Sequence, residues 1–297
     1  MQKIFSPPDQ QTRQRAIGQI DQLPPSTRML LTASGFDPMK APDPSDWLAV
    51  HPESGQSYFQ FINSRPNLPG PAHRTIYLQP LEAFPADAPS LSQLKTFTES
   101  YFSMPVTVLP LIPGGLGKIT TRVNPDTRKM QLLTGDILSA LKNRLPDNAY
   151  CLLGITLSDL YPGPAWNYVF GEATLDERVG IYSFARYDPR FSGENVPDRT
   201  RLLLRRCCKI LAHETGHMFG IEHCIYFQCV MNGSNHLPED DSKPLHLCPV
   251  DLHKLYFSTR LDVVARYAHL RDFCRQVGFS DEADWIEQQL KKIPPGR

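Results

Sequence analysis

The chain has 297 residues, enough for one large domain or two smaller ones around a real hydrophobic core. Its 31 lysines and arginines balance its 31 aspartates and glutamates, so no net charge attracts it to nucleic acid or to an anionic membrane. Apolar residues make up 41% and charged residues 21%, as in ordinary globular proteins, which argues against wholesale disorder. Nucleic acid and membranes are therefore not expected as partners.

The sequence also bears on the compartment. No run approaches the roughly 18 consecutive apolar residues of a membrane-spanning helix, and the first residues lack the apolar stretch of a secretory signal. Of the seven cysteines, Cys224, Cys229 and Cys248 lie near a group of histidines. This arrangement fits metal binding in a reducing compartment better than a disulfide framework. We expect a soluble intracellular protein, cytoplasmic or nuclear.

The N-terminal third is rich in proline. Fourteen of the 28 prolines fall in the first 90 residues, where each ring fixes φ and removes a backbone donor. Aromatic residues such as Trp47, Tyr58 and Phe61 could still dock on a core. The sequence predicts an irregular, wrapping extension over residues 1–100, packed on a second domain formed by residues 101–297.

Regular elements are predicted from about residue 105. Short apolar runs at 106–111 and 150–157 read as strands, and the helical spacing of Ile137, Leu138 and Leu141 lies between them. Further strands are predicted at 167–173 and 180–186, followed by a long helix that begins near Pro197. Beyond residue 250 the pattern is helical, with a break at Gly278 and Ser280. The prediction is an α/β fold with a helical tail.

The long helix ends in a motif with metal-binding spacing, His213-Glu214-Thr215-Gly216-His217-Met218-Phe219-Gly220-Ile221-Glu222-His223. Residues i and i+4 of a helix lie one above the other, so His213 and His217 can present two imidazole nitrogens to one ion. Gly220 can adopt the left-handed conformation that ends a helix. The chain could then turn and bring His223 to the metal as a third ligand.

Three imidazoles leave one position of a tetrahedral zinc open to water, whose pKa the metal lowers toward about 7. Glu214 follows the first histidine and can face this water without binding the metal. It could accept the proton and pass it to a leaving amine, as a general base and then a general acid. The motif therefore predicts hydrolysis by a zinc-bound water.

The motif resembles that of the metzincin zinc peptidases, HExxHxxGxxH followed by a methionine turn, with Met231 at the position of the methionine. Cys224 directly after the third histidine, then Cys229 and Cys248, resemble the archaemetzincins. The resemblance implies a metzincin-like mixed α/β (α+β) fold over 101–297. Its parts would be a twisted mixed sheet, a long active-site helix, a zinc-bearing C-terminal subdomain and a helical tail.

The resemblance also implies a second, structural zinc held by four cysteines. Cys224, Cys229 and Cys248 match three of them, whereas Asp251 stands at the fourth position. A carboxylate can bind zinc, although it is a harder ligand than a thiolate. Three alternatives stay open: Asp251 is the ligand, His246 or His253 replaces it, or the second site is empty or loosely occupied.

These inferences predict a zinc metallopeptidase acting on a peptide or protein, with the 167–173 strand as a candidate edge for substrate. One alternative is a non-catalytic, zinc-stabilised peptide-binding or scaffolding module. Another is a latent peptidase whose N-terminal segment covers the cleft. The sequence leaves the substrate, the cleavage preference and the oligomeric state open.

Overall fold

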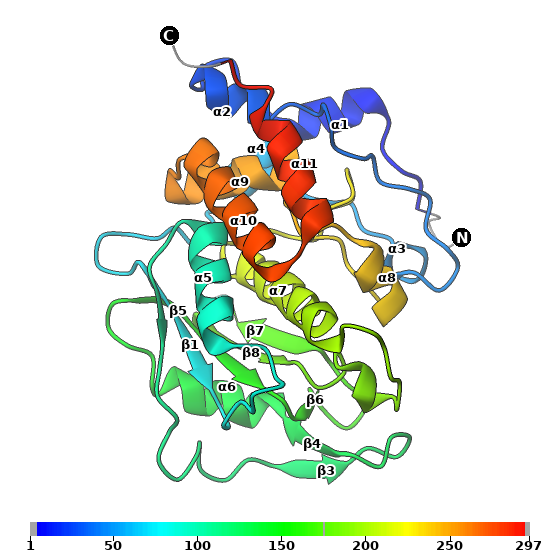
Figure 1. Cartoon of the computed structure of the whole chain (residues 1–297), viewed down its shortest axis with the longest axis vertical. Helices are drawn as coiled ribbons and strands as arrows, with labels where there is room; N and C mark the ends of the chain where they lie inside the picture. Colours follow the sequence, from blue (N-terminus) through cyan, green and yellow to red (C-terminus); the bar gives the residue numbers. More distant parts are fainter. Residues whose placement is uncertain (1–4, 175, 295–297) are drawn as a thin grey trace. The chain divides into compact units, whose positions relative to one another are not determined.

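The computed structural model describes residues 5–174 and 176–294 (Figure 1). The chain forms two compact units, which we describe separately. Unit 1 comprises Met1–Leu68, Ser100–Ser103 and Phe219–Arg297, and unit 2 comprises Pro69–Glu99 and Met104–Met218. The predicted boundary near residue 100, as a division between domains, stays a prediction.

Unit 2 is built on a five-stranded sheet in the order β2-β1-β5-β8-β7. Four strands run parallel, and β7 lies antiparallel to β8 at one edge. All eight residues of β5 are buried, as expected for a central parallel strand covered on both faces. The strands are β1 (Thr75–Pro80), β2 (Val106–Val108), β5 (Ala149–Thr156), β7 (Gly171–Thr174) and β8 (Val179–Ser183).

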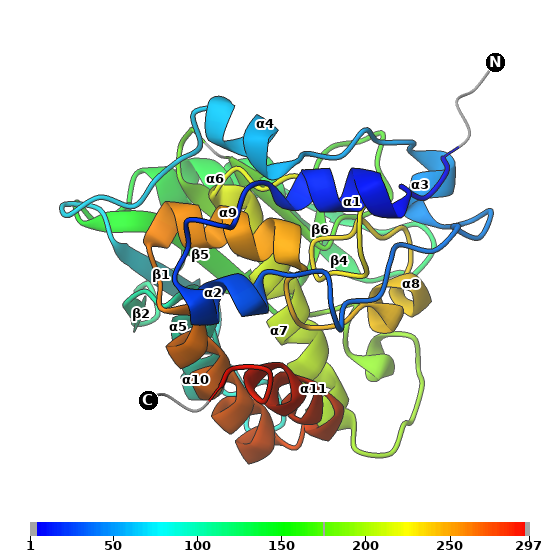
Figure 2. The ribbon, with the colours of Figure 1, turned by 90° about the horizontal axis from the view of Figure 1, so that it is seen from above.

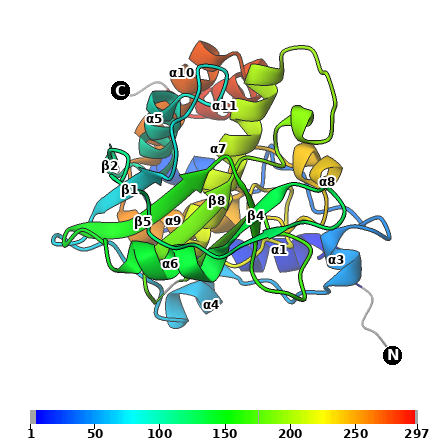
Figure 3. The same ribbon diagram turned by 90° about the horizontal axis from the view of Figure 1, so that it is seen from below.

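Two helices, α6 (Thr134–Lys142) and α7 (Arg199–Met218), lie on opposite faces of this sheet (Figure 3). Strand side chains alternate between the faces. Val179 and Ile181 of β8 join a buried cluster with Leu141 of α6. Tyr182, the residue after Ile181, points to the opposite face, where α7 lies. Because of this alternation, β8 packs against α6 with one face and against α7 with the other.

The remaining elements of unit 2 flank this core. A smaller sheet has the order β3-β4-β6, in which β4 is antiparallel to β3 and parallel to β6. Inside it, buried Asp159 accepts hydrogen bonds from Gln131 and Arg186. The elements are α5 (Leu91–Phe102, whose last residues belong to unit 1), β3 (Thr121–Val123), β4 (Met130–Leu133), β6 (Asp159–Tyr161) and the 3₁₀ turn η1 (Pro189–Phe191).

Unit 1 is helical. α10 packs against α11 and α2, while α9 packs against α1 and α4 (Figure 2). Several helices begin at side-chain caps, including Asp9, Ser57 and Asp262. The helices are α1 (Gln10–Ile17), α2 (Pro25–Leu30), α3 (Trp47–Val50), α4 (Tyr58–Asn63), α8 (Leu237–Ser242), α9 (Pro249–Thr259), α10 (Val263–Val277) and α11 (Ser280–Leu290).

The mixed α/β class with a helical tail is confirmed, and β5, β8, α6 and α7 fall where they were predicted. The expectation of an irregular segment up to about residue 90 is wrong in two respects: α1, α2, α3 and α4 are helical, and residues 75–80 are a strand. They form β1, between β2 and β5, because parallel pairing joins segments far apart in the chain and leaves little local signal. No helix formed by the described residues is both long and apolar enough to cross a membrane.

Leu141 tests the core between α6 and the sheet. Its side chain is fully buried against Gly154 of β5 and Ile181 of β8. Leu141→Ala should lower the free energy of unfolding by about 2–5 kcal/mol, because a cavity replaces packed methyl groups. Met130→Ala, at a side chain that is 60% exposed, should change it by about 0.5 kcal/mol or less. Urea denaturation measures both, and equal effects would contradict this account of the core.

Candidate metal centres

The first centre begins on α7. The Nε2 atoms of His213 and His217 lie 3.1 Å apart, and both side chains are half-buried. Two nitrogens on one tetrahedral zinc would be about 3.3–3.4 Å apart, given Zn–N distances of about 2.0–2.1 Å. The i, i+4 spacing therefore brings the two nitrogens to a separation that fits one zinc ion, and their role as ligands stays a prediction.

The end of α7 is well defined. The Tyr150 hydroxyl of β5 donates a hydrogen bond to the carbonyl of Met218, the last residue of the helix. Gly220, two residues later, has φ of 80°, in the left-handed region that favours glycine. The helix thus ends as the sequence predicted, and the chain changes direction before His223.

Glu214 lies beside the edge of the sheet. A Cβ atom added to Gly171 of β7 would be 3.5 Å from Oε1 of Glu214. Because glycine has no side chain, the carboxylate of Glu214 can lie close to the main chain of β7. Burial, followed by the negative charge of Glu214, raises the pKa of Tyr182 well above its usual range. The half-buried carboxylate therefore faces the β7–β8 ribbon.

β7 is an edge strand, as predicted for this segment, although it covers Gly171–Thr174 and not all of 167–173. Among the residues that the structure describes, β8 is its one hydrogen-bonded neighbour in the sheet. An edge strand presents main-chain groups that can pair with an extended peptide. The strand nearest Glu214 is thus also one to which a peptide can be added.

His223 belongs to unit 1. Its Nδ1 atom lies 2.9 Å from Oε1 of Glu53, a residue of the proline-rich segment, and its ring contacts that of Trp47 edge to face. Trp47 is one of the aromatic residues predicted to dock on a core, whereas Glu53 could not be predicted, because it belongs to no motif and to no helix or strand.

A second group of donors is fully buried within unit 1. The Sγ atoms of Cys224 and Cys248 lie 3.5 Å apart, and Oδ2 of Asp251 is 3.3 Å from Sγ of Cys229 and 3.5 Å from that of Cys248. All four donor atoms lie within 4.8 Å of one another. The structure therefore brings together the three cysteines and the aspartate that the sequence singled out.

These spacings match a small tetrahedron. Zn–S bonds of about 2.3 Å and Zn–O bonds of about 2.1 Å give edges of about 3.8 Å between sulfurs and about 3.6 Å between sulfur and oxygen. The observed separations of 3.3–3.5 Å are slightly shorter. The residues present fit a zinc ion with three sulfur ligands and one oxygen ligand.

The sequence Cys248-Pro249-Val250-Asp251 explains how an aspartate reaches the sulfurs. Cys248 is the N-cap of α9, Pro249 occupies its first turn, and Asp251 follows three residues after the cap. Side chains at the cap and three residues later face each other at a helix start. The positive end of the helix dipole also favours anionic ligands there.

Asn232 shapes the loop that carries the other two cysteines. Its Oδ1 atom accepts a hydrogen bond from the backbone N–H of Cys229, and its Nδ2 group donates to the carbonyls of Cys224 and Phe227. Asn232 is buried and was missed from the sequence. An asparagine after Met231 has no spacing signature, so its role becomes visible only in the folded loop.

Electrostatics favour a cation in this group. Burial raises the pKa of the Cys229 and Cys248 thiols well above the usual range, and negative charge on Cys224 and Asp251 adds to the shift. Burial also acts on Cys224, but hydrogen bonds from the other two thiols outweigh it and lower the pKa of Cys224. A divalent cation would stabilise the deprotonated forms that ligands require.

Lys254 holds the other oxygen of the carboxylate. Its buried Nζ atom lies 2.8 Å from Oδ1 of Asp251, which leaves Oδ2 directed at the sulfurs. The two histidines considered as substitutes lie in other contacts. Nδ1 of His246 is 2.8 Å from Glu282, and Nδ1 of His253 is 2.7 Å from a backbone carbonyl. The geometry places Asp251 with the cysteines.

Met231 is fully buried, and its carbonyl accepts a hydrogen bond from the backbone N–H of Cys224. This bond ties the methionine segment to the residue that follows His223. A buried methionine is equally consistent with plain core packing, so its role in a methionine turn stays a prediction.

A third cluster, Asp46, His236 and Glu239, is explained by a helix cap. Nδ1 of His236 accepts a hydrogen bond from the backbone N–H of Glu239 at the start of α8. The ring proton is then on Nε2, which lies 3.1 Å from Asp46. Both ring nitrogens are used, so this cluster closes a loop onto a helix without a metal.

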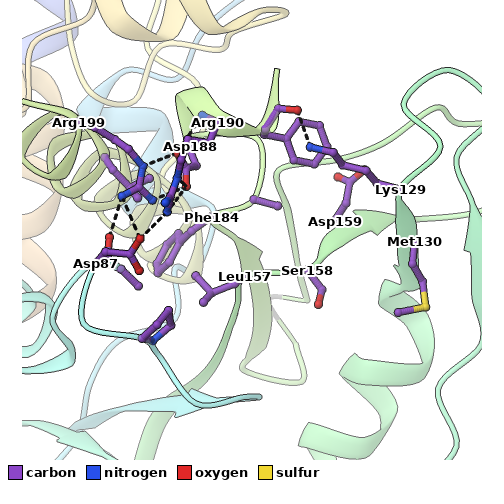
Figure 4. Close-up of a pocket in the computed structure, with 15 residues that line it drawn as sticks. Asp87, Lys129, Met130, Leu157, Ser158, Asp159, Phe184, Asp188, Arg190 and Arg199 are labelled. Atoms are coloured by element: carbon purple, nitrogen blue, oxygen red, sulfur yellow. Dashed lines mark hydrogen bonds and ion pairs between the residues drawn. The ribbon is translucent and has the colours of Figure 1, made fainter. Parts of the chain in front are cut away.

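Unit 2 also contains a hollow of about 440 Å³ near the start of α7 (Figure 4). Asp87, Asp188, Arg190 and Arg199 point toward one another at one side and form ion pairs. Because these charges are already paired, they offer no converging set of ligand groups. Glu214 lies 15 residues beyond Arg199 on the same helix, about 22 Å away.

The chain is similar to known proteins over the region that contains these residues. The family model for peptidase family M54 matches residues 123–256, a range that includes the three histidines, Glu214 and the cysteine group. Human archaemetzincin-2 is 38% identical over 265 residues, covering 79% of this chain and 73% of that protein. Human archaemetzincin-1 is 33% identical over 277 residues, covering 84% of this chain and 54% of that protein.

Among solved structures, archaemetzincin (AmzA) from Archaeoglobus fulgidus, complexed with malonate, is 29% identical. It covers 61% of this chain and 99% of its own, with a TM-score of 0.46. From the family match and the relatives, the chain is a zinc metallopeptidase, so its substrates are peptides or proteins. It belongs to peptidase family M54, the archaemetzincins, as the resemblance of its histidine motif and cysteines implied, and its relatives include archaemetzincin-2.

The buried carboxyl of Asp251 predicts a pH dependence in the metal-free chain. Burial raises its pKa from 3.8 to about 6, so the folded chain retains a proton that the unfolded chain releases. The free energy of unfolding should therefore fall as pH rises from about 4 to about 6, by about 3 kcal/mol from this group. Urea denaturation in a chelator at several pH values measures this.

Asp251→Asn is the matched control, because it cannot ionise at this position. The difference in unfolding free energy between wild type and variant should change across this pH interval and become constant above it. A difference that stays constant from pH 4 to pH 7 would contradict the raised pKa.

Proposed function

We propose that His213, His217 and His223 hold a catalytic zinc ion and that Glu214 is the general base of peptide-bond hydrolysis. One observation carries the proposal: two histidine nitrogens 3.1 Å apart lie on the same helix turn as a carboxylate that faces an edge strand. His223, five residues after the helix ends, is the third ligand in this proposal.

When bound there, zinc supplies positive charge that makes water more acidic and a peptide carbonyl more electrophilic. Glu214 accepts the proton of the attacking water on its carboxylate and delivers it to the nitrogen of the leaving amine. A purely structural site needs no such base. The carboxylate beside β7 therefore favours catalysis over a binding or scaffolding role. If peptidase activity rose after removal of the N-terminal segment, the chain would be a latent peptidase.

Substrate is proposed to bind as an added strand on β7. A Cβ atom added to Gly171 would be in van der Waals contact, at 3.5 Å, with Oε1 of Glu214. An extended peptide paired with this edge would have its backbone close to the carboxylate. Main-chain pairing would contribute affinity for any extended peptide and would leave side-chain preference to residues outside the strand.

The second zinc, in this proposal, is bound by Cys224, Cys229, Cys248 and Asp251 and stabilises the fold. The tetrahedral spacing of the donors and their complete burial support a structural site closed to water. Of the three alternatives for Asp251, ligation is the one that its oxygen positions favour.

An intracellular location, cytoplasmic or nuclear, remains part of the proposal. None of the seven cysteines is paired in a disulfide, a state that a reducing compartment maintains. That the chain acts without nucleic acid or membrane partners likewise stays an expectation from its balanced charge.

Glu214→Gln tests the general base. The variant should bind zinc as wild type does, while hydrolysis should fall by about 10²–10⁴-fold because the amide cannot accept the proton. Mass spectrometry of a diverse peptide mixture after incubation with each zinc-loaded protein measures cleavage. Glu194→Gln, at an exposed glutamate, is the control and should cleave as wild type does. Retained turnover in a pure Glu214→Gln preparation would refute the assigned role.

Zinc stoichiometry tests the second site. Wild type should bind two equivalents, and His217→Ala should lose one of them. Asp251→Ala should weaken the other by at least about tenfold, whereas Asp251→Cys should retain it, because a thiolate is a good zinc ligand. Metal analysis after dialysis against a graded series of chelators measures this. If the wild type bound only one equivalent of zinc, and no substitution of Asp251 changed that amount, the proposed second zinc site would be wrong.

A further inference from the structure

The residues around His223 form a small, well-connected framework within unit 1. Gln56 donates from Nε2 to the carbonyl of Gly220 and accepts at Oε1 from the N–H of Glu222. A Cβ atom on Gly55, whose φ is 68°, would come within 2.5 Å of Ile225. The segment of residues 47–56 therefore packs directly on the segment of residues 220–225.

Within this framework, the side chain of Glu53 contacts the ring of His223. Its Oε1 atom is 2.7 Å from Nε1 of Trp47 and 2.9 Å from Nδ1 of His223. One carboxylate oxygen thus accepts hydrogen bonds from two ring nitrogens. Both partners belong to unit 1, and the Glu53 and His223 side chains are only 27% and 21% exposed.

Trp47 is itself fixed, so Glu53 has a rigid second partner. The backbone N–H of Trp47 donates to Oε1 of Glu239, 2.9 Å away. Its ring lies over Gly233, where an added Cβ would come within 2.4 Å of it. A tryptophan held at its backbone and its ring restricts where the Glu53 carboxylate can lie.

This contact determines which nitrogen of His223 is available. A neutral imidazole has one N–H and one lone pair, and a carboxylate oxygen can only accept. Nδ1 must therefore carry the proton toward Glu53, which leaves the lone pair on Nε2. A histidine that donates to a carboxylate through one nitrogen is oriented and made more basic at the other, which favours metal binding there.

We propose that Glu53 is a positioning residue for the catalytic metal, acting through His223 by fixing its Nδ1–H tautomer and ring orientation. The inference rests on the proposed function, because it assumes that His223 binds the zinc. It assigns to the proline-rich segment a part in assembling the metal centre, in addition to its packing on the core.

The test is the zinc affinity of the full chain, measured by competition with a chromophoric chelator. Glu53→Ala should weaken the zinc site that depends on His217 by about 10–100-fold, the usual effect of losing such a partner. Glu53→Gln should lose less, because its amide oxygen still accepts from Nδ1. Glu222→Ala, which removes an exposed carboxylate next to His223, is the matched control and should stay within about threefold of wild type.

A double variant shows whether Glu53 acts through His223. In a His223→Ala background, Glu53→Ala should have no further effect on zinc affinity. In wild type, ¹⁵N spectra of the histidine side chains should show His223 with its proton on Nδ1, and the Glu53→Ala spectrum should show a mixture of tautomers. A Trp47→Phe variant, which removes the second donor and keeps a ring, should shift the same signals less.

The outcomes separate the two proposals. Unchanged affinity and tautomer in Glu53→Ala, with wild-type zinc binding that His217→Ala abolishes, would overturn the role of Glu53 and leave the proposed function intact. A Glu53→Ala effect that persists in the His223→Ala background would also overturn it. If no zinc in wild type depended on His217 or His223, the proposed function would fail, and the role of Glu53 with it.

Discussion

The helical spacing of α7 is the constraint on which the chemistry depends. One helix carries His213, Glu214 and His217, so their relative positions follow from 3.6 residues per turn once the helix is held in place. The helix α7 packs on the face of β8 that carries Tyr182. The hydroxyl of Tyr150 donates a hydrogen bond to the carbonyl of Met218, the last residue of α7. The same packing sets the carboxylate against an edge strand, where a peptide can pair.

The cysteine group obeys a different constraint. Four donors that become negative when they bind a metal are buried together, which is costly unless a cation compensates them. Two of the donors, Cys248 and Asp251, lie at the start of α9. Lys254 forms an ion pair with Asp251 and neutralises part of the negative charge. A carboxylate can therefore stand where a fourth thiolate is expected without disturbing the helix that presents it.

The sequence predicted those features of the fold and site that depend on residues close together in the chain. The i, i+4 histidines, the helix end before Gly220 and the buried strand β5 follow from short-range patterns. β1 was missed because its partners lie far away in the chain. Glu53, Asn232 and Lys254 were missed for a related reason: each acts through one or two contacts that exist only after folding.

The central claim is that one zinc is held by imidazoles next to Glu214 and another by sulfurs and a carboxylate. Anomalous diffraction at the zinc edge from crystals of the zinc-loaded chain tests it most directly. The account predicts two peaks, one bound by His213, His217 and His223 and one by Cys224, Cys229, Cys248 and Asp251. A zinc-loaded crystal with no peak beside His213 and His217, or with Glu214 as a ligand, would contradict it.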